Sequence, residues 1–284
     1  MGKYFEGARQ HLESLIMTIR SLDIHIKRYR VGAPKKVVLL HGFTGTSNTW
    51  EEVISHFPSS VEVLTVDLIG HGQTAKPSNA SRYFVEEQIE DLHEILHQLQ
   101  WSNFTLVGYS MGGRLALAYA TKYPVTKLVL ESSSPGLEDE KERLSRKLSD
   151  ELLAQRIMDD GVLSFVDFWE DIPLFGSQKR LSTEKQLAVR EERLAQSEIG
   201  LANSLKGFST GMQPSYWKSL RELSIPVYLL AGELDLKFCE MARRMHHELP
   251  NSFIEVVKDV GHAIHVEKPK FFATIIKEVI LEEE

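Results

Sequence analysis

The sequence predicts an α/β fold with a mostly parallel central sheet, helices on both faces of the sheet and a helical cap inserted between two strands. Short apolar runs alternate with amphipathic segments over the first 134 residues, as expected when helical crossovers connect parallel strands. One of these runs breaks into glycines and restarts at once as a helix, at residues 105–120. Strand character then stops between residues 135 and 207, and it resumes near residue 225.

The elements of the first half follow from local patterns. Residues 1 to about 15 are expected to form a short helical extension, and alternation over residues 17–30 indicates a half-exposed strand in an edge hairpin. Continuous apolar character predicts a strand covered on both faces at residues 36–40. Further strands are expected at residues 61–66, 105–107 and 126–131, and helices from about residue 47, over 84–99 and over 111–120.

The stretch without strands predicts a helical cap above the sheet. Its charged amphipathic segments carry only a few apolar anchors, such as Phe165, Trp169 and Phe175. Strands are expected again at residues 225–231 and 253–257, each followed by a helix. We therefore predict an α/β core in two parts, residues 1–134 and 208–284, and a helical cap at residues 135–207.

The composition indicates a soluble globular protein. With 284 residues, of which 42% are hydrophobic, the chain can bury a substantial core. Its formal net charge of −7 argues against general affinity for nucleic acid or anionic membranes. No apolar run is long enough to cross a bilayer, and the N-terminal region lacks the apolar core of a signal peptide. The single cysteine, Cys239, suits a reducing compartment, so we expect a cytoplasmic protein of undetermined oligomeric state.

The break in the strand near residue 108 has the pattern Gly108-x-Ser110-x-Gly112. In a nucleophile elbow of this pattern, a sharp turn from strand to helix holds a serine in strained geometry, and glycines keep side chains out of the crowded backbone. The turn places the serine oxygen at a helix N-terminus, where unpaired N–H groups favour negative charge. The pattern therefore predicts a nucleophilic or basic Ser110.

A serine hydroxyl needs a histidine to take its proton and a carboxylate to orient that histidine. Asp235 follows the strand at 225–231, and His262 follows the strand at 253–257, so both lie past the carboxyl end of a strand, as Ser110 does. We take these three as the candidate catalytic triad. Glu233 and His265 remain alternatives for the acid and the histidine.

An oxyanion hole requires two backbone N–H donors, one after the nucleophile and one in the loop beyond the first central strand. Met111 and Phe43 occupy these positions. No spacing typical of metal ligands stands out, so no metal or other cofactor is expected.

The chain resembles the α/β-hydrolase fold family over nearly its whole length, on the basis of His41-Gly42, the Gly108–Gly112 motif, Asp235 and His262. The order serine, acid, histidine along the chain is the order of that family. The family includes esterases, lipases, epoxide and haloalkane hydrolases, C–C bond hydrolases and some lyases. The resemblance therefore implies the fold more closely than the reaction.

A narrower resemblance extends outside the triad, to the 2-succinyl-6-hydroxy-2,4-cyclohexadiene-1-carboxylate synthases of menaquinone biosynthesis. The similar stretches are residues 108–114, 131–137, 143–146, 165–170, 173–175, 187–190 and 232–238. The resemblance implies a carbon–oxygen lyase in which the triad serine acts as a base. Such an enzyme removes a ring proton from 2-succinyl-5-enolpyruvyl-6-hydroxy-3-cyclohexene-1-carboxylate, so that pyruvate leaves without consumption of water.

The same resemblance implies where the small-molecule tricarboxylate substrate binds. Arg114, Arg146 and Arg190 fall where the substrate-binding arginines of that family fall, and a guanidinium can grip a carboxylate at two points. Arg114 stands one helical turn beyond the nucleophile, so it can face the same cavity. Tyr109 and Trp169 match positions that line the pocket of the family.

Two other functions are compatible with the residues. A carboxylester or C–C bond hydrolase would use the same triad through an acyl-Ser110 intermediate, and a non-catalytic receptor would keep the triad without turnover. An esterase cap should present apolar surface to an acyl chain, whereas the lyase needs cationic groups directed inward. The arginines of the predicted cap, together with Trp169, favour the lyase.

Overall fold

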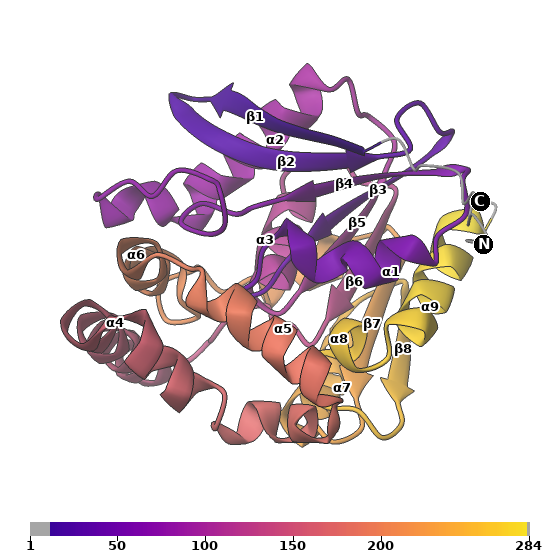
Figure 1. The fold of residues 1–284 in the computed structure, drawn as a ribbon. Helices are drawn as coiled ribbons and strands as arrows, with labels where there is room; N and C mark the ends of the chain where they lie inside the picture. Colours follow the sequence, from indigo (N-terminus) through magenta and orange to yellow (C-terminus); the bar gives the residue numbers. More distant parts are fainter. Residues whose placement is uncertain (1–11, 283–284) are drawn as a thin grey trace, which may run out of the picture.

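The computed structural model describes residues 12–282, whose eight strands form one sheet in the order β1-β2-β4-β3-β5-β6-β7-β8 (Figure 1). β1 pairs antiparallel with β2, and β2 antiparallel with β4, whereas all other neighbours are parallel. The parallel strands therefore end at one common edge, where sites form in such sheets. The strands are β1 (Leu12–Ile19), β2 (Leu22–Tyr29), β3 (Lys35–Leu40), β4 (Val61–Val66), β5 (Thr105–Tyr109), β6 (Lys127–Glu131), β7 (Val227–Gly232) and β8 (Ser252–Val257).

Helices cover both faces of the sheet. α2 (Val85–Gln98), α3 (Met111–Ala120) and α7 (Leu236–Glu248) pack with one hydrophobic core, and α1 (Glu51–Ser55) and α9 (Pro269–Leu281) pack with the other. Every residue of β4, β5 and β6 is buried, because these strands lie between the two helical layers. The shorter helical turns are η1 (Ser47–Trp50), η2 (Ala80–Tyr83), η4 (Lys218–Glu222) and α8 (Ile264–Glu267).

The chain between β6 and β7 is helical. It forms α4 (Glu140–Trp169), η3 (Pro173–Arg180), α5 (Thr183–Leu194) and α6 (Glu198–Phe208), of which α4 and α6 lie at the left of Figure 1 and α5 near its centre. α4 kinks at Gly161, whose φ of 78° is accessible to glycine at little cost. α4 and α6 bury a small hydrophobic core of their own, which includes Ile157, Phe165 and Leu201. These helices carry several of the cavity residues described below.

The N-terminal region differs from the predicted helical extension. Residues 12–15 belong to β1, which pairs with β2 in a register that sets Leu15 opposite Ile26, and residues 1–11 lie outside the described part of the chain. The helical prediction is wrong for residues 12–15 because pairing with a neighbouring strand decided the conformation, and local sequence does not record that pairing.

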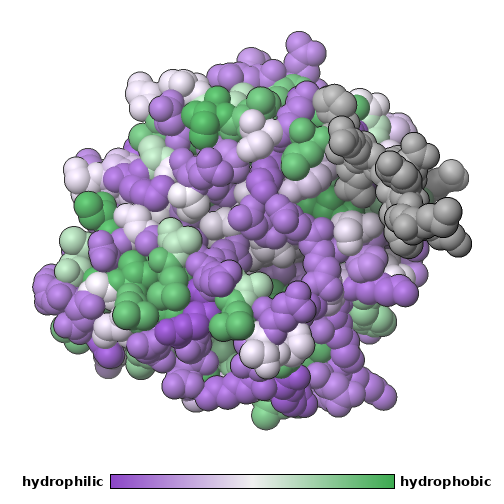
Figure 2. Space-filling model, viewed as in Figure 1, coloured by the Kyte–Doolittle hydropathy of each residue, from purple (hydrophilic) through white to green (hydrophobic). Residues whose placement is uncertain are grey.

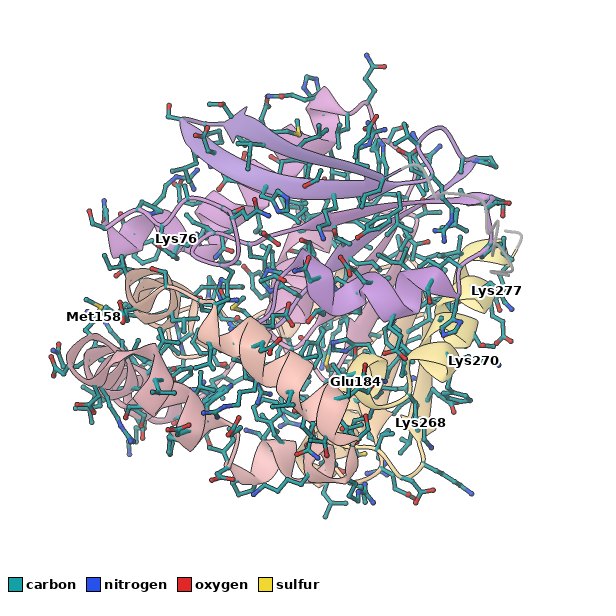
Figure 3. All side chains as sticks on the ribbon, in the orientation of Figure 1. Lys76, Met158, Glu184, Lys268, Lys270 and Lys277 are labelled. Atoms are coloured by element: carbon teal, nitrogen blue, oxygen red, sulfur yellow. The ribbon has the colours of Figure 1, made fainter. Side chains whose placement is uncertain are left out.

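The surface carries hydrophilic residues over most of the face drawn in Figure 2, with hydrophobic areas among them over the helices between β6 and β7. Met158 of α4 and Lys270 of α9, both labelled in Figure 3, lie on opposite sides of the molecule, and both are exposed. None of the helices within residues 12–282 combines the length and the apolar character needed to cross a membrane.

Candidate active site

Ser110 stands at the turn between β5 and α3, with φ 50° and ψ −107°. This backbone conformation is strained for a residue with a side chain. The neighbouring glycines make the turn possible: a Cβ on Gly108 would lie 2.4 Å from the Gly112 carbonyl oxygen, and one on Gly112 would lie 2.3 Å from the Leu40 carbonyl oxygen. The Ser110 N–H is held by the Glu131 carbonyl oxygen at 2.8 Å. Close packing of β3, β5, β6 and α3 therefore requires this glycine pattern.

The His262 ring lies within hydrogen-bond distance of both Ser110 and Asp235. Nε2 of His262 is 3.0 Å from Oγ of Ser110, and Nδ1 of His262 is 2.6 Å from Oδ2 of Asp235. Asp235 caps α7 through its other carboxylate oxygen, which accepts from the Phe238 N–H at 3.3 Å. The cap fixes the carboxylate, and the carboxylate orients the imidazole so that Nε2 can accept the serine proton.

The two alternative residues have other partners. Oε2 of Glu233 accepts from the Asp259 N–H at 3.1 Å, on the side of the loop away from His262 Nδ1. His265 is buried and binds both carboxylate oxygens of Glu131 through Nδ1, at 2.9 and 2.8 Å. Neither residue has a recorded contact with Ser110, so the geometry supports Asp235 and His262 for the acid and the histidine.

Phe43 and Met111 line the same cavity as Ser110. Met111 is the first residue of α3, where a helix has no internal acceptor for its N–H. No hydrogen-bond acceptor is recorded for either N–H among residues 12–282. Both donors are therefore available to an oxygen that gains negative charge, as an oxyanion hole requires.

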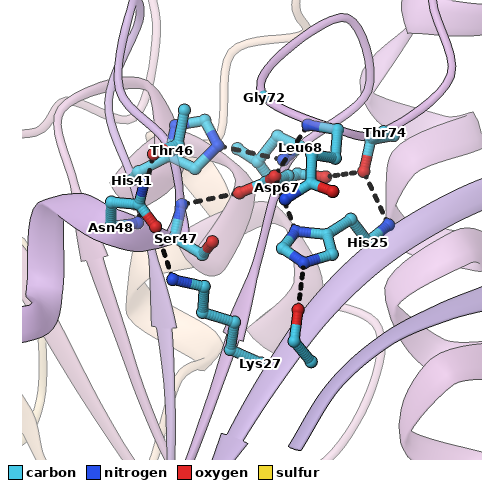
Figure 4. A network of polar contacts seen from close by, with 12 residues as sticks. His25, Lys27, His41, Thr46, Ser47, Asn48, Asp67, Leu68, Gly72 and Thr74 are labelled. Atoms are coloured by element: carbon cyan, nitrogen blue, oxygen red, sulfur yellow. Dashed lines mark hydrogen bonds and ion pairs between the residues drawn. The ribbon is translucent and has the colours of Figure 1, made fainter. Parts of the chain in front are cut away.

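A buried polar network holds the loop that carries Phe43 (Figure 4). His41 accepts from the Leu68 N–H through Nε2 at 2.9 Å and donates through Nδ1 to the Gly42 carbonyl oxygen at 2.8 Å. These two contacts require the neutral imidazole with its proton on Nδ1. Burial lowers the pKa of His41, which keeps that form.

Asp67 ties the same loop to the strands behind it. Its carboxylate accepts from the Ser47 N–H at 2.6 Å, from the Gln73 N–H at 2.9 Å and from Nδ1 of His25 at 2.8 Å. A buried carboxylate with three donors is a strong structural anchor. The glycine-rich segment after β4 therefore supports the loop that carries Phe43, and it has no recorded contact with the triad.

A cavity opens beside Ser110, and we call it the Ser110 cavity. Its walls come from the loop after β3, from β5 and α3, from the helices between β6 and β7, and from the start of α7 and the loop before α8. Side chains of three cationic residues border it, and several aromatic rings form the rest of the wall. The lining residues are Phe43, Tyr109, Ser110, Met111, Arg114, Ser132, Ser133, Ser134, Arg146, Trp169, Leu174, Phe175, Ser204, Leu205, Phe208, Ser209, Thr210, Lys237, Phe238 and His262.

Arg114 lines this cavity without a carboxylate partner. Its guanidinium donates to Oε1 of Gln213 and, at 2.9 Å, to the Phe208 carbonyl oxygen, and its central carbon lies 4.4 Å from the Phe208 ring centroid. No Asp or Glu oxygen in residues 12–282 lies within 4.0 Å of it. Burial, together with the nearby Arg146, lowers the pKa of Arg114 to about 9. An anion bound in the cavity would pair with the guanidinium and offset the cost of burying its charge.

Arg146 comes from α4 and lines the same cavity. Its Nε donates to Oδ2 of Asp150 at 2.7 Å, one turn along α4, and its side chain remains 42% exposed. The two terminal nitrogens of the guanidinium have no recorded partner in the described chain, so they can bind a ligand carboxylate in addition.

The two aromatic residues predicted to line the pocket both border the Ser110 cavity. Trp169 packs with its ring 5.6 Å from the Phe43 ring, and its buried indole N–H has no acceptor in the described structure. Tyr109 packs 5.4 Å from the His262 ring, and burial raises its pKa well above its usual value. Tyr109 therefore stays neutral beside the triad, and Trp169 offers one free donor to a ligand.

Arg190 lies elsewhere, contrary to the expectation that it faces the same cavity as Ser110. Its guanidinium binds Asp167 at 2.5 Å and also Glu170, both from the end of α4, and it does not line the Ser110 cavity. It borders a neighbouring cavity between η3 and α5 instead. The sequence-based prediction is corrected on this point: two acidic side chains already neutralise this guanidinium.

Arg193, about one helical turn further along α5, is a buried arginine that the sequence patterns above did not single out. It is 7% exposed, its guanidinium carbon lies 4.6 Å from the Phe175 ring centroid, and its recorded polar partner is Oε1 of Gln178 at 3.1 Å. Burial lowers the pKa of Arg193. Phe175 lines the Ser110 cavity, so Arg193 stands directly behind its wall.

The inward face of α5 is poorly marked in the sequence. Its apolar residues Leu187 and Leu194 are 53% and 36% exposed, whereas Val189, Arg193 and Gln196 lie on the more buried side. The spacing of 189, 193 and 196 is a helical face, and it is the signal that could have distinguished Arg193 from Arg190.

Comparison with known proteins agrees with this geometry. A family described as alpha/beta hydrolase fold matches residues 35–269 of the chain. A Bacillus subtilis (strain 168) relative, provisionally named 2-succinyl-6-hydroxy-2,4-cyclohexadiene-1-carboxylate synthase, is 46% identical over 250 residues, covering 87% of this chain and 91% of its own. The synthase of that name from Enterobacter sp. (strain 638) is 30% identical over 249 residues, covering 86% and 91%.

A solved structure extends the comparison to three dimensions. The structure of MenH from S. aureus superimposes with a TM-score of 0.86 at 38% sequence identity, covering 92% of this chain and 97% of that chain. The match includes the sheet order and the helical segment between β6 and β7, since it spans nearly the whole of both chains. From its fold, its sequence and the geometry around Ser110, we conclude that the chain belongs to the alpha/beta hydrolase fold family.

Proposed function

We propose that this protein is a carbon–oxygen lyase that eliminates pyruvate from 2-succinyl-5-enolpyruvyl-6-hydroxy-3-cyclohexene-1-carboxylate. The product is 2-succinyl-6-hydroxy-2,4-cyclohexadiene-1-carboxylate, an intermediate of menaquinone (vitamin K2) biosynthesis. The observation that carries the proposal is the Ser110 cavity itself: a serine paired with His262 and Asp235 faces cationic side chains that have free hydrogen-bond donors. The names of the relatives from Bacillus subtilis, Enterobacter and S. aureus support the same reaction.

The chemistry of the substrate explains how a serine can act as a base. The ketone of the 2-succinyl group makes the proton on ring carbon 2 acidic, because the electron pair left behind is shared with the ketone oxygen as an enolate. His262 accepts the Ser110 proton at Nε2, and the Ser110 oxygen takes the ring proton. The N–H groups of Phe43 and Met111 are placed to hold the enolate oxygen.

The elimination then follows from the positions of the double bonds. The electron pair at ring carbon 2 forms a double bond to carbon 3, the existing double bond moves between carbons 4 and 5, and the carbon–oxygen bond at carbon 5 breaks. The leaving group is the enolate of pyruvate, which takes the proton held by His262 and becomes pyruvate. Ser110 has kept the ring proton, so the triad returns to its starting state without water.

Substrate binding requires anchors for three carboxylates. We assign Arg114 and Arg146 to two of them, since each lines the cavity with donors to spare. Arg193 is a better candidate than Arg190 for a further cationic contact, because no Asp or Glu oxygen of the described chain lies within 4.0 Å of it and it packs on the Phe175 ring, which lines the cavity. Tyr109 and Trp169 would then form the wall against the ring.

The wider setting is part of the same proposal. We treat residues 135–207 as a helical cap on an α/β core formed by residues 1–134 and 208–284. A small-molecule tricarboxylate is the only partner that the site calls for. We place the protein in the cytoplasm. Its single cysteine, Cys239, is buried and free, which suits a reducing compartment.

A coupled assay of pyruvate release from the enolpyruvyl substrate tests the proposal. The wild-type protein should release one pyruvate for each diene formed, and the absorbance of the diene measures the second product. Ser110→Ala should abolish turnover, by at least about a thousandfold, while still binding the substrate, because it removes the base and leaves the arginines intact. Turnover near the wild-type rate in this variant would refute the role of Ser110.

The hydrolase alternative rests on one observation. The triad residues are aligned by hydrogen bonds, and no acceptor is recorded for the N–H groups of Phe43 and Met111 among residues 12–282, as acyl transfer through Ser110 would require. The cationic cavity argues against it, because an ordinary ester brings no carboxylates to pair with Arg114 and Arg146. We expect p-nitrophenyl acetate hydrolysis to be slow, and fast Ser110-dependent hydrolysis would favour the esterase.

A further inference from the structure

Lys237 lines the Ser110 cavity together with Arg114 and Arg146 and has no role in the proposed reaction. It is the second residue of α7 and follows Asp235 of the triad by two positions. Its side chain is exposed, and it borders the cavity together with Ser110 and His262.

The position of Lys237 at the start of a helix is unfavourable for a positive charge. The first turn of a helix favours acidic residues, because its unpaired N–H groups carry partial positive charge, and a lysine there is unfavourable. The first turn of α7 has no acidic residue to offset it. Within the described chain, no Asp or Glu oxygen lies within 4.0 Å of the Lys237 ammonium group, although 14 of the other lysine and arginine side chains have such a partner.

The position of Lys237 also complements that of the arginines. Its Nζ lies 5.7 Å from the centroid of the Phe238 ring, and that ring lies 4.7 Å from the ring of His262. Lys237 therefore stands on the side of the cavity formed by the triad histidine. Arg114 and Arg146 come from α3 and α4, which form another part of the wall.

We propose that Lys237 binds a carboxylate of the substrate and selects for ligands that carry carboxylates at separate ends. This inference rests on the proposed function, because it assigns a further specificity-determining residue to the same cavity. A ligand with one carboxylate can satisfy either Lys237 or the arginines. A tricarboxylate can satisfy both groups at once, and its ring is then held between them, next to Ser110.

Steady-state kinetics of pyruvate release in the full-length protein test the role of Lys237. Lys237→Met should raise KM about fivefold with kcat changed less than twofold, which is the size expected for one solvent-accessible ion pair. Lys237→Arg should restore KM to within about twofold of wild type, because it keeps the charge. Lys270→Met, which removes an exposed lysine of α9 with no recorded side-chain contact, is the matched control and should leave KM unchanged.

The salt dependence of KM distinguishes an ion pair with the substrate from a purely structural role of Lys237. Raising the ionic strength should raise the KM of the wild-type protein more steeply than that of Lys237→Met, because the variant has one ion pair fewer to screen. A KM of Lys237→Met equal to that of the wild type, or parallel salt dependences, would overturn the inference. So would an increase in KM that Lys237→Arg does not reverse.

A binding experiment separates failure of this inference from failure of the proposed function. Tricarballylate, a simple tricarboxylate, should raise the thermal unfolding midpoint of the wild-type protein more than that of Lys237→Met at the same concentration. If the wild-type protein releases no pyruvate, the proposed function fails, and this comparison still decides on Lys237. Equal shifts in the two proteins would overturn the assignment of Lys237.

Discussion

Replacement of Arg114 by methionine should separate function from stability, because the same buried charge that binds substrate is a cost to the folded protein. Arg114→Met keeps an apolar stem against the Phe208 ring but removes the guanidinium. We expect the variant to lose most of its activity and to unfold no more easily than the wild type.

The magnitude follows from the contacts of the guanidinium. Burial lowers the pKa of Arg114 to about 9, which corresponds to about 5 kcal/mol of unfavourable charge burial. Its removal leaves the Gln213 and Phe208 oxygens without a donor, at about 1–3 kcal/mol each. The free energy of unfolding should therefore rise by up to about 3 kcal/mol, and should fall by no more than about 1 kcal/mol.

The loss of activity should be much larger. Removing one partner of a desolvated ion pair with the substrate costs about 2–5 kcal/mol, so kcat/KM should fall from about thirtyfold to a few thousandfold. Pyruvate release measures the activity, and urea unfolding measures the stability. Arg221→Met is a suitable control, because its side chain is 74% exposed and pairs with Glu248 outside the Ser110 cavity.

Two results would refute the reasoning on Arg114. If the free energy of unfolding fell by more than about 3 kcal/mol, the guanidinium would be a structural element and not a charge held ready for an anion. If kcat/KM fell no further than in Arg221→Met, the substrate would bind without Arg114, and the proposed arrangement of the carboxylates would be wrong.

Two further predictions concern other charged groups. Arg193→Gln should raise KM at least about tenfold. Arg190→Gln should change KM less than about threefold, because Asp167 and Glu170 already bind the Arg190 guanidinium. Steady-state kinetics that ranked the two variants in the opposite order would support Arg190 as the substrate-binding residue. Burial and the nearby His41 lower the pKa of His71 to about 3, so below pH 6.5 the unfolded chain takes up a proton that the folded protein does not. The wild type should therefore lose about 2 kcal/mol of stability at His71 between pH 7 and pH 5, and urea unfolding at both values should show a smaller pH dependence in His71→Gln; equal pH dependences would contradict the assignment.

The sequence by itself determined the sheet and the order of the chemical groups along it. Apolar runs predicted β3 to β8 within about two residues. The central strands are readable because a strand covered on both faces must be largely apolar, whereas β8 is a half-exposed edge strand. The sequence also predicted the glycines of the elbow and the positions of Ser110, Asp235 and His262 after their strands. Parallel strands end at one edge, so residues that follow them come together whatever the rest of the chain does.

The tertiary structure alone decided which charged side chains enter the cavity. Arg190 and Arg193 are three residues apart on α5, and nothing in their own spacing says that Asp167 and Glu170 neutralise the first. Lys237 follows a catalytic residue, but its missing carboxylate partner is visible only when every neighbour is in place. In the same way, β1 became a strand because β2 lies beside it.

These differences have one physical reason. An apolar pattern records how much of an element is buried, since burial is nearly independent of the identity of the neighbour. The state of a charged group depends on the particular atoms within a few ångströms of it, and those atoms come from segments far apart in the sequence.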